Sequence, residues 1–263
     1  MTSDPNQARS IRAALVTGGA KRVGAALVRA LAEDGWIVVL HYHNSEAEAL
    51  ALAAGLAAAG RVCLPVQADL SRQADIESLI PRALDLLAPV SGRLRCLVNN
   101  ASSFVYDSIA SMRWETWTGH LDPNLAAPAF LSQAFARTVG EDERGWIINM
   151  LDQKIEALNP DFFSYTVSKF GLLGLTRLLA LALRPRIRVH GIAPGIALPS
   201  GKQTAERFEK AWAKSPLGRN ATVAEIVAAA RLLLNARCVS GSVIVIDGGE
   251  SLANQGRDVE FLA

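Results

Sequence analysis

The stretch Ala13-Ala14-Leu15-Val16-Thr17-Gly18-Gly19-Ala20-Lys21-Arg22-Val23-Gly24 decides the fold, because a short apolar run passes through glycines directly into a helical pattern. Glycine allows a tight turn and lets the backbone approach a ligand closely. The N-terminus of a helix presents unpaired N–H groups, which favour an anion. A strand, a glycine turn and a helix in this order therefore predict a dinucleotide site with its pyrophosphate at the turn. The alternative is a tight turn whose small residues serve packing alone.

Short apolar runs alternate with longer helical patterns along the whole chain. The runs span Ala13–Thr17, Trp36–Tyr42, Val62–Gln67, Leu94–Asn99, Trp146–Met150, Ile187–Ile192 and Val243–Asp247. The helical patterns, rich in Ala and Leu, span Arg22–Asp34, Ser45–Ala59, Arg72–Leu87, Leu125–Val139, Phe162–Leu183 and Val223–Leu234. Most runs are apolar throughout, which is typical of a parallel sheet covered on both faces. We predict an α/β fold, a single doubly wound Rossmann-type domain with about seven parallel strands.

The sequence shows no internal repeat and no linker that would divide it. We expect residues 1–11 to form a frayed N-terminal lead-in, because they lack the apolar core of a secretory signal. Residues 12–263 then form one domain. Residues 198–217 break the rhythm of strands and helices with Pro199, Ser200, Gly201 and Pro216. We expect this segment to be a mobile excursion that covers the substrate.

Composition excludes several classes of partner. The formal net charge of +2 does not predict binding to nucleic acid or to an anionic membrane. No stretch approaches the roughly 20 uninterrupted apolar residues of a membrane-spanning helix. Cys63, Cys96 and Cys238 are few, odd in number and mostly set among apolar neighbours. They indicate reduced thiols in a cytoplasmic protein, with neither disulfides nor a zinc site, and we expect no metal.

The end of the second strand indicates which dinucleotide binds. NAD-selecting sites usually carry an acid about 20 residues past the glycine turn, where it binds the ribose hydroxyl. Here the strand ends in His41-Tyr42-His43-Asn44-Ser45, with no acid. A 2′-phosphate would accept hydrogen bonds from Arg22, His43 and Ser45. We therefore predict NADPH over NADH. The alternative is that Arg22 is a solvated helix-start residue and that His41 and His43 are surface groups at the strand end.

Tyr165 and Lys169 form a candidate catalytic pair. Their spacing of four residues places both on one face of a helix. A phenol titrates near 10, and a neighbouring cation lowers that pKa and makes the phenol a usable proton donor or acceptor. The pair follows the fifth strand, and ligands of such sheets lie beyond the carboxyl ends of the strands. This position favours a catalytic pair over a surface pair.

On these motifs and others, the chain resembles the short-chain dehydrogenase/reductase family along nearly its whole length. The further motifs are Asp69, Asn99-Asn100-Ala101, Asn124, Pro194-Gly195 and Asp247-Gly248-Gly249. The resemblance implies an adenine contact, a wall behind the cofactor, a residue that relays protons through water, and a turn beside the nicotinamide. The cofactor-binding residues that it implies are Gly18, Lys21, Arg22, Val23, His41, His43, Asn44, Ser45, Asp69, Leu70, Asn100, Ala101, Ser102, Tyr165, Lys169, Pro194, Gly195 and Ile196.

Two departures from the family pattern narrow the resemblance. Asp152 stands thirteen residues before Tyr165, where the family normally has serine, and Arg22 stands where glycine is usual. Both departures resemble the pteridine reductases. So do the stretches Lys21-Arg22, His41-Tyr42-His43, Gln67-Ala68-Asp69-Leu70-Ser71 and Asn100-Ala101-Ser102-Ser103-Phe104. This resemblance implies that Asp152 works with Tyr165 in proton delivery, that Phe104 stacks on a pterin, and that Ser102 lies near the cofactor phosphates and the pterin edge.

Elementary chemistry is consistent with those roles. A carboxylate beside Tyr165 opposes tyrosinate formation, which offsets part of the effect of Lys169 and disfavours simple alcohol oxidation. A pterin offers N–H donors that Asp152 can accept and a flat ring that Phe104 can stack against. The alternatives are that Asp152 is a solvated loop acid and that Phe104 is ordinary core packing. Asn124, likewise, would lie in the first turn of a helix that begins at Asp122-Pro123.

Together these features predict an NADPH-dependent reductase of a pterin-like substrate. Asp152, Tyr165, Lys169 and Asn124 are the expected catalytic residues, and Ser102, Phe104, Asp152 and Tyr165 the expected substrate contacts. One alternative is a carbonyl reductase of a 3-oxoacyl thioester or a sugar ketone, in which Asp152 merely replaces serine. Another is a non-catalytic NADP-binding protein. The resemblance also implies a homotetramer, for which Leu125–Val139 and Phe162–Leu183 offer apolar candidate surfaces.

Overall fold

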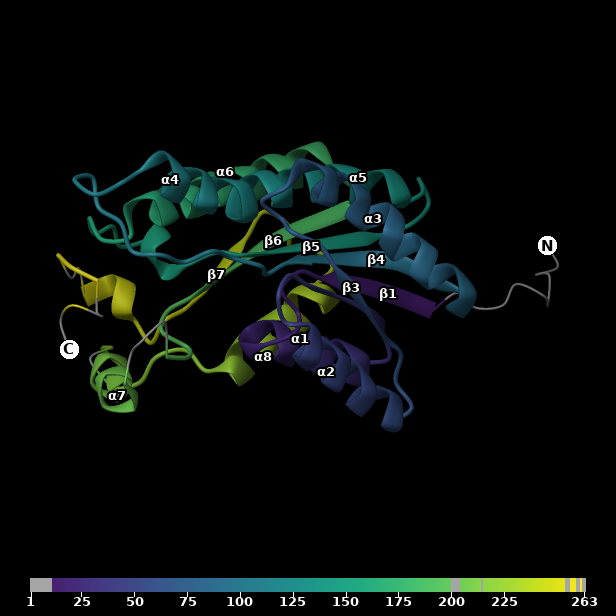
Figure 1. Ribbon diagram of the computed structural model, residues 1–263, viewed down its shortest axis with the longest axis horizontal. Coiled ribbons are helices and arrows are strands. Elements are labelled where there is room, and N and C mark those ends of the chain that lie inside the picture. The colour runs from purple at the N-terminus through teal and green to yellow at the C-terminus, as the bar shows by residue number, and fades with distance from the viewer. Residues whose placement is uncertain (1–10, 200–203, 214, 254–255, 259–260, 262–263) are drawn as a thin grey trace.

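A parallel sheet forms the centre of the molecule (Figure 1). The computed structural model describes residues 11–199, 204–213, 215–253, 256–258 and 261, and in them seven strands pair in the order β3-β2-β1-β4-β5-β6-β7. The strands are β1 (Ile11–Val16), β2 (Ile37–Tyr42), β3 (Cys63–Gln67), β4 (Gly92–Asn99), β5 (Gly145–Met150), β6 (Ile187–Pro194) and β7 (Val243–Ile246). All adjacent pairs are parallel. The predicted doubly wound fold is confirmed.

Helices cover both faces of the sheet, with α1, α2 and α8 on one side and α3, α4, α5 and α6 on the other (Figure 1). Their bounds are α1 (Arg22–Glu33), α2 (Glu46–Ala58), α3 (Gln73–Leu87), α4 (Trp114–Leu121), α5 (Ala127–Thr138), α6 (Phe163–Ala182), α7 (Ala205–Ala213) and α8 (Val223–Asn235). Short helical turns occur at Ala88–Val90, Asp122–Ala126, Gln153–Ile155 and Glu250–Ala253.

The core lies in two apolar layers that share the strands. Along β1, Ala14 and Val16 face the layer under α1, α2 and α8, while Ala13 and Leu15 face the opposite layer. All four side chains are fully buried. A strand buried on both faces needs apolar residues at successive positions, which explains the unbroken apolar runs of the sequence.

The order of the strands determines where a ligand can bind. The chain leaves β1 toward β2 on one side, and β4 pairs with the other side of β1. The connections on either side of this switch run in opposite directions, which leaves a crevice beyond the carboxyl ends of β1 and β4. In Figure 1, α7 lies beyond this same edge of the sheet.

Two parts of the sequence differ from their prediction. Residues 1–10 of the expected lead-in lie outside the described residues, whereas Ile11 belongs to β1 rather than to the lead-in. In the expected covering segment, residues 200–203 and 214 also lie outside the described residues, but Ala205–Ala213 forms the helix α7. The helix-breaking Pro199 and Pro216 lie on either side of α7, so they bound a helix instead of preventing one.

The region before α5 also differs. The sequence did not predict α4, and a π-helical turn at Asp122–Ala126 joins α4 to α5. Pro123 lies within this turn and has no N–H to donate, so the turn widens while the chain stays helical. The alternative that Asp122 and Pro123 begin a helix is therefore wrong.

Two buried histidines face different surroundings. His41 on β2 accepts a hydrogen bond from the Gly18 N–H (3.1 Å), and its Nε2 donates to the Ala68 carbonyl (3.1 Å). His190 on β6 is fully buried, and neither ring nitrogen has a partner among the described residues. Burial lowers the pKa of each ring to about 4, so both are neutral near pH 7. His41 thus links the glycine turn to the chain after β3, whereas His190 leaves two polar ring atoms unpaired among the described residues.

We expect His190→Leu to stabilise the fold, because an unpaired buried polar group costs about 1–3 kcal/mol. The folded pKa of His190 lies below the unfolded value, so stability is lost as pH falls from about 6.5 to about 4. The substitution should reduce that loss. Urea unfolding near neutral pH and near pH 5 measures both effects. His41→Leu is the matched control and should destabilise, since it leaves Gly18 and Ala68 unpaired; a lower stability of His190→Leu near neutral pH would contradict the assignment.

Candidate active site

A cavity of about 610 Å³ opens at the carboxyl ends of the strands. It gathers most of the residues that the sequence singled out. Those in its wall are Gly18, Lys21, Arg22, Val23, His41, His43, Asn44, Ser45, Asn100, Ala101, Ser102, Phe104, Asp152, Tyr165, Lys169, Pro194, Gly195 and Ile196. Asp69, Leu70 and Asn124 are not among the described residues that form the wall. The cavity extends from the glycine turn after β1 to Tyr165 on α6.

Hydrogen bonds fix the glycine turn against the loop after β4. The Thr17 hydroxyl accepts the N–H groups of Asn100 (2.9 Å) and Ala101 (3.0 Å). The Asn100 amide donates to the carbonyls of Thr17 (2.9 Å) and Gly18 (3.1 Å). Gly18 has φ +61°, and a Cβ there would approach the Ala101 Cα to 3.0 Å. The turn therefore requires glycine, both for its backbone conformation and for the space around it.

This turn fits the pyrophosphate of a dinucleotide. Lys21, the N-cap of α1, makes no side-chain capping bond, so no cap side chain occupies the first N–H groups of the helix. A Cβ on Gly24 would overlap the Gly18 carbonyl, so glycine keeps the helix start close to the turn. Arg22 and Val23, the first two residues of α1, also line the cavity. A helix N-terminus with such an approach is suited to an anion.

Arg22 has an uncommon backbone conformation. Its φ of 54° lies in the left-handed region, which favours glycine. Its guanidinium donates to the carbonyl of Pro199 (2.7 Å) and reaches that of Leu198 (3.5 Å). Neighbouring Lys21 pairs with Glu48 (2.6 Å). A charged side chain is thus kept at a strained position, from which it bridges the glycine turn and the chain that follows β6.

The end of β2 carries the buried His41, and three accessible residues follow the strand. His41 is buried and holds the glycine turn through Gly18, so the alternative that it is a surface group is wrong. His43 and Asn44 are exposed and Ser45 is half-buried, and all three line the cavity. Asp69 lies beside His43 (3.6 Å between Nε2 and Oδ2). His41 therefore supports the wall, while the other three could reach a ligand.

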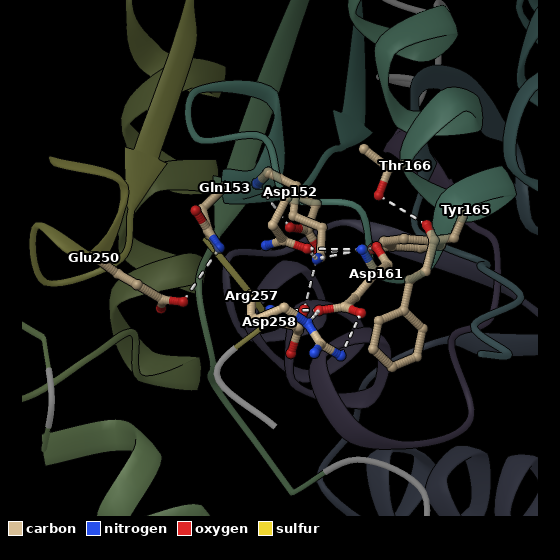
Figure 2. A network of polar contacts seen from close by, with 11 residues as sticks. Asp152, Gln153, Asp161, Tyr165, Thr166, Glu250, Arg257 and Asp258 are labelled. Carbon is tan, nitrogen blue, oxygen red and sulfur yellow. Dashed lines mark hydrogen bonds and ion pairs between the residues drawn. The ribbon is translucent and has the colours of Figure 1, made fainter. Parts of the chain in front are cut away.

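A direct hydrogen bond joins Tyr165 and Asp152. The Tyr165 hydroxyl donates to Asp152 Oδ2 (2.7 Å), and Asp152 Oδ1 accepts the N–H of Lys154 (2.9 Å) (Figure 2). Asp152 is therefore not a solvated loop acid. Burial, and then the charge of Asp152, raise the pKa of Tyr165 well above its usual value near 10. Tyr165 keeps its proton at neutral pH.

Lys169 lies beneath this pair. Its ammonium donates to the Met150 carbonyl (2.8 Å) and is 5.4 Å from the centre of the Tyr165 ring. Burial lowers the pKa of Lys169 to about 8, against an opposing effect of Asp152. The sequence led us to expect that Lys169 lowers the pKa of Tyr165. In the structure, burial and Asp152 outweigh any such effect.

Phe104 forms part of an aromatic wall. It is 39% exposed, stacks on Phe162 (centroids 4.1 Å apart, 15° between planes) and meets Tyr165 edge-on (4.7 Å, 80°). One part of the ring is thus supported while another faces the cavity. Phe104 is not ordinary core packing. Ser102, two residues earlier, is exposed in the same wall.

Asn124 lies behind the wall. Its Oδ1 accepts the N–H of Ser103 (2.8 Å), and its Nδ2 donates to the Ser103 carbonyl and to Ser168 Oγ (both 3.0 Å). The side chain therefore joins the loop after β4 to α6, and both of its polar atoms take part in these bonds. The backbone carbonyl of Asn124 lacks the partner that it would have in a regular α-helix, because residue 128 is proline and has no N–H to donate.

Comparison with known proteins places the chain in a family. The family model described as Enoyl-(Acyl carrier protein) reductase matches residues 18–251. This chain is a short-chain dehydrogenase/reductase. Pteridine reductase 1 of Leishmania tarentolae is 34% identical over 279 residues, covering 91% of this chain and 96% of the relative. The 3-oxoacyl-[acyl-carrier-protein] reductase of a Synechocystis strain is 29% identical over 246 residues, covering 92% and 98%.

A solved structure of the family resembles this one closely. FolM Alternative dihydrofolate reductase 1 from Brucella canis, complexed with NADP, is 39% identical, with a TM-score of 0.89 and coverage of 95% of this chain and 97% of that one. Within the described part of this short-chain dehydrogenase/reductase, no helix is long and apolar enough to cross a membrane. The same residues contain no cluster of three or more His, Cys, Asp or Glu that could hold a metal ion.

Four polar wall residues were missed from the sequence: Gln153, Lys154, Glu250 and Asp258. Glu250 accepts a hydrogen bond from the amide of Gln153 (3.2 Å; Figure 2) and another from the amide of Asn220. Burial raises the pKa of Glu250 to about 7. Glu250 directly follows the Asp247-Gly248-Gly249 turn, and Lys154 lies two residues after Asp152, so proximity to these motifs was the available signal.

Asp152→Asn should lower the pKa of Tyr165, because it removes the negative charge that opposes phenolate formation and preserves the size of the side chain. A difference titration of tyrosinate absorbance measures the change, and Tyr165→Phe identifies the transition among the three tyrosines. Glu250→Gln is the control and should shift the transition less, since its bonds go to Gln153 and Asn220. If Tyr165 titrates at the same pH in wild type and in Asp152→Asn, then Asp152 does not contribute to the raised pKa of Tyr165.

Proposed function

We propose that this short-chain dehydrogenase/reductase reduces a pterin-like heterocycle with NADPH. The observation that carries the proposal is the Asp152–Tyr165 hydrogen bond beside the accessible ring of Phe104 in one cavity. A carboxylate accepts the amino and ring N–H donors of a pterin, and an aromatic ring stacks on its plane. Similarity to Pteridine reductase 1 and to the FolM reductase adds support.

NADP(H) is the cofactor in this proposal. The turn at Gly18 and the start of α1 would hold the pyrophosphate, while Arg22, His43 and Ser45 would bind the 2′-phosphate. Lys169 would hold the nicotinamide ribose. When bound, NADPH supplies the hydride that reduces a C=N or C=C bond of the substrate.

We expect Arg22→Gly to reduce the preference for NADPH. Glycine adopts the left-handed backbone of residue 22 without strain, so the turn should fold while the guanidinium is lost. A hydrogen bond to a charged group contributes about 1.5–3 kcal/mol, so NADPH affinity should fall about tenfold or more. Fluorescence titration with NADPH and NADH measures this change. NADH, which lacks the 2′-phosphate, is the control and should bind as before; an equal loss for both would exclude a phosphate contact.

Tyr165 would deliver the proton that completes the reduction together with Asp152, which accepts the hydrogen bond of the Tyr165 hydroxyl. Because its raised pKa keeps Tyr165 protonated, the hydroxyl is a donor in the resting site. Asp152 accepts that hydroxyl and can also accept an N–H of the substrate. Lys169 is cationic below about pH 8 and would stabilise the phenolate left after donation. Asn124 would contribute a water site through its backbone carbonyl.

The test follows NADPH oxidation with dihydrobiopterin or dihydromonapterin, and with acetoacetyl thioester in parallel. We expect turnover of the pterin, and a loss of about 100- to 10,000-fold in kcat for Tyr165→Phe, which is the range for general acid catalysis. NADPH affinity should stay unchanged. Turnover of the thioester alone would contradict the pterin assignment and favour a carbonyl reductase. Cofactor binding with no turnover of any carbonyl or pterin would favour a non-catalytic protein.

Assembly and location complete the proposal. The helices α5 and α6 expose Phe130 (55%), Leu178 (65%) and Leu181 (61%), which supports an association of copies into a homotetramer. We propose a cytoplasmic location, which the three free cysteines support.

A further inference from the structure

Three residues near the end of the chain contact the loop between β5 and α6. We call Arg257, Asp258 and Phe261 the distal clamp. The Arg257 guanidinium binds both oxygens of Asp161 (2.7 and 2.9 Å), and the Asp258 N–H donates to the same carboxylate (2.9 Å) (Figure 2). The Asp161 side chain is only 4% exposed. Two parallel hydrogen bonds from one guanidinium to a buried carboxylate fix both the position and the orientation of the Asp161 side chain.

Asp258 also connects the distal clamp to the catalytic carboxylate. Its own carboxylate pairs with the Lys154 ammonium (2.6 Å), and the two side chains are 12% and 3% exposed. The backbone N–H of Lys154 donates to Asp152 Oδ1 (2.9 Å). Asp152 in turn accepts the hydroxyl of Tyr165. A continuous series of polar contacts therefore runs from Asp258 to Tyr165.

Phe261 extends the distal clamp to the aromatic wall. Its ring meets Tyr106 (centroids 5.2 Å apart) and Phe162 (6.2 Å), and Phe162 stacks on Phe104. Phe162 has φ 53°, a left-handed conformation that a bulky residue rarely adopts. Such strain persists only where surrounding contacts hold the residue in place. Phe261 supplies one of those contacts directly, while Arg257 and Asp258 hold the preceding residue, Asp161.

We propose that the distal clamp positions Asp152 and Phe104 for the substrate, which makes Arg257, Asp258 and Phe261 positioning residues of the reaction. The inference rests on the proposed function in that Asp152 and Phe104 are taken to touch the substrate. Its basis is geometric: the contacts of the distal clamp end at the two groups that would bind the substrate. Its partners Lys154, Asp161 and Phe162 belong to the segment between β5 and α6, and its partner Tyr106 belongs to the segment between β4 and α4. The distal clamp therefore acts on the substrate side of the cavity.

The charge of Asp258 adds a second effect. It is one of the carboxylates that raise the pKa of Tyr165, after burial and Asp152. Asp258→Asn should thus change the pH dependence of turnover as well as its size, with the alkaline limb moving to lower pH. A purely structural residue would leave the pH profile in place. Asp258→Glu keeps the charge and should restore the alkaline limb.

The experiment compares Arg257→Ala and Asp258→Asn with wild type. A small displacement of a positioned group can cost about 100-fold in rate, so we expect kcat/KM to fall about 10- to 100-fold in each variant. NADPH affinity should not change. Arg231→Ala is the matched control, because Arg231 makes a similar two-bonded pair with Asp34 (2.8 and 2.9 Å) away from the cavity wall. It should leave kcat/KM unchanged.

Amide hydrogen exchange supplies a readout independent of substrate. In Asp258→Asn, exchange should accelerate in residues 152–162 and not around the glycine turn. Unchanged exchange there would overturn the proposal, and so would faster exchange with wild-type kcat/KM and pH profile. If wild type turns over only acetoacetyl thioester, the pterin function fails, and the same kinetic comparison with that substrate still decides on the distal clamp. If wild type turns over neither, the exchange result decides.

Discussion

The hydrogen bonds between Thr17 and Asn100 hold together the two strand ends on which the site depends. β1 and β4 are neighbours at the switch in strand order, and their following loops would otherwise diverge. The Thr17 hydroxyl accepts two N–H groups of the β4 loop, while the Asn100 amide bonds two carbonyls of the glycine turn. Asn124 continues this framework by fixing Ser103. The glycine turn after β1 and the loop that carries Phe104 are thus joined by one set of hydrogen bonds.

The electrostatics around Tyr165 are dominated by three acids and two lysines. Burial raises the pKa values of Tyr165 and Glu250, and the charges of Asp152 and Asp258 raise both further. The lysines offset this only in part, because Lys154 pairs with Asp258 and Lys169 donates to the Met150 carbonyl. The wall is therefore rich in hydrogen-bond acceptors, and the phenol keeps its proton. Such a wall suits a substrate with several N–H donors, and it suits protonation better than deprotonation.

The strands and most helices were predictable because local sequence determines them. Unbroken apolar runs specify strands that are covered on both faces, and the crossover helices follow their Ala- and Leu-rich periodicity. The helix α4 was missed because Trp114–Leu121 has little apolar periodicity and is followed by Pro123. The helix α7 was missed because its flanking prolines were taken as signs of an irregular loop.

The site was predictable only where residue type and spacing carry the chemistry. The spacing of Tyr165 and Lys169, and the aspartate before them, follow from local patterns. The inward turn of His41 and the use of the Asn124 side chain as a brace depend on burial, which the sequence does not display. Asp258 and Lys154 are far apart in the chain and meet only through the fold. No local pattern could have paired them.

The two sides of the cavity come from different parts of the chain, and this has an evolutionary consequence. The side that would bind the cofactor is built from the β1 turn and the β4 loop, whereas residues after β7 complete the far wall of the side that would bind the substrate. If this division holds, mutations in that last segment can be selected for a new substrate while the glycine turn after β1 stays intact. After gene duplication, a copy could diverge in substrate range and still inherit a working dinucleotide site.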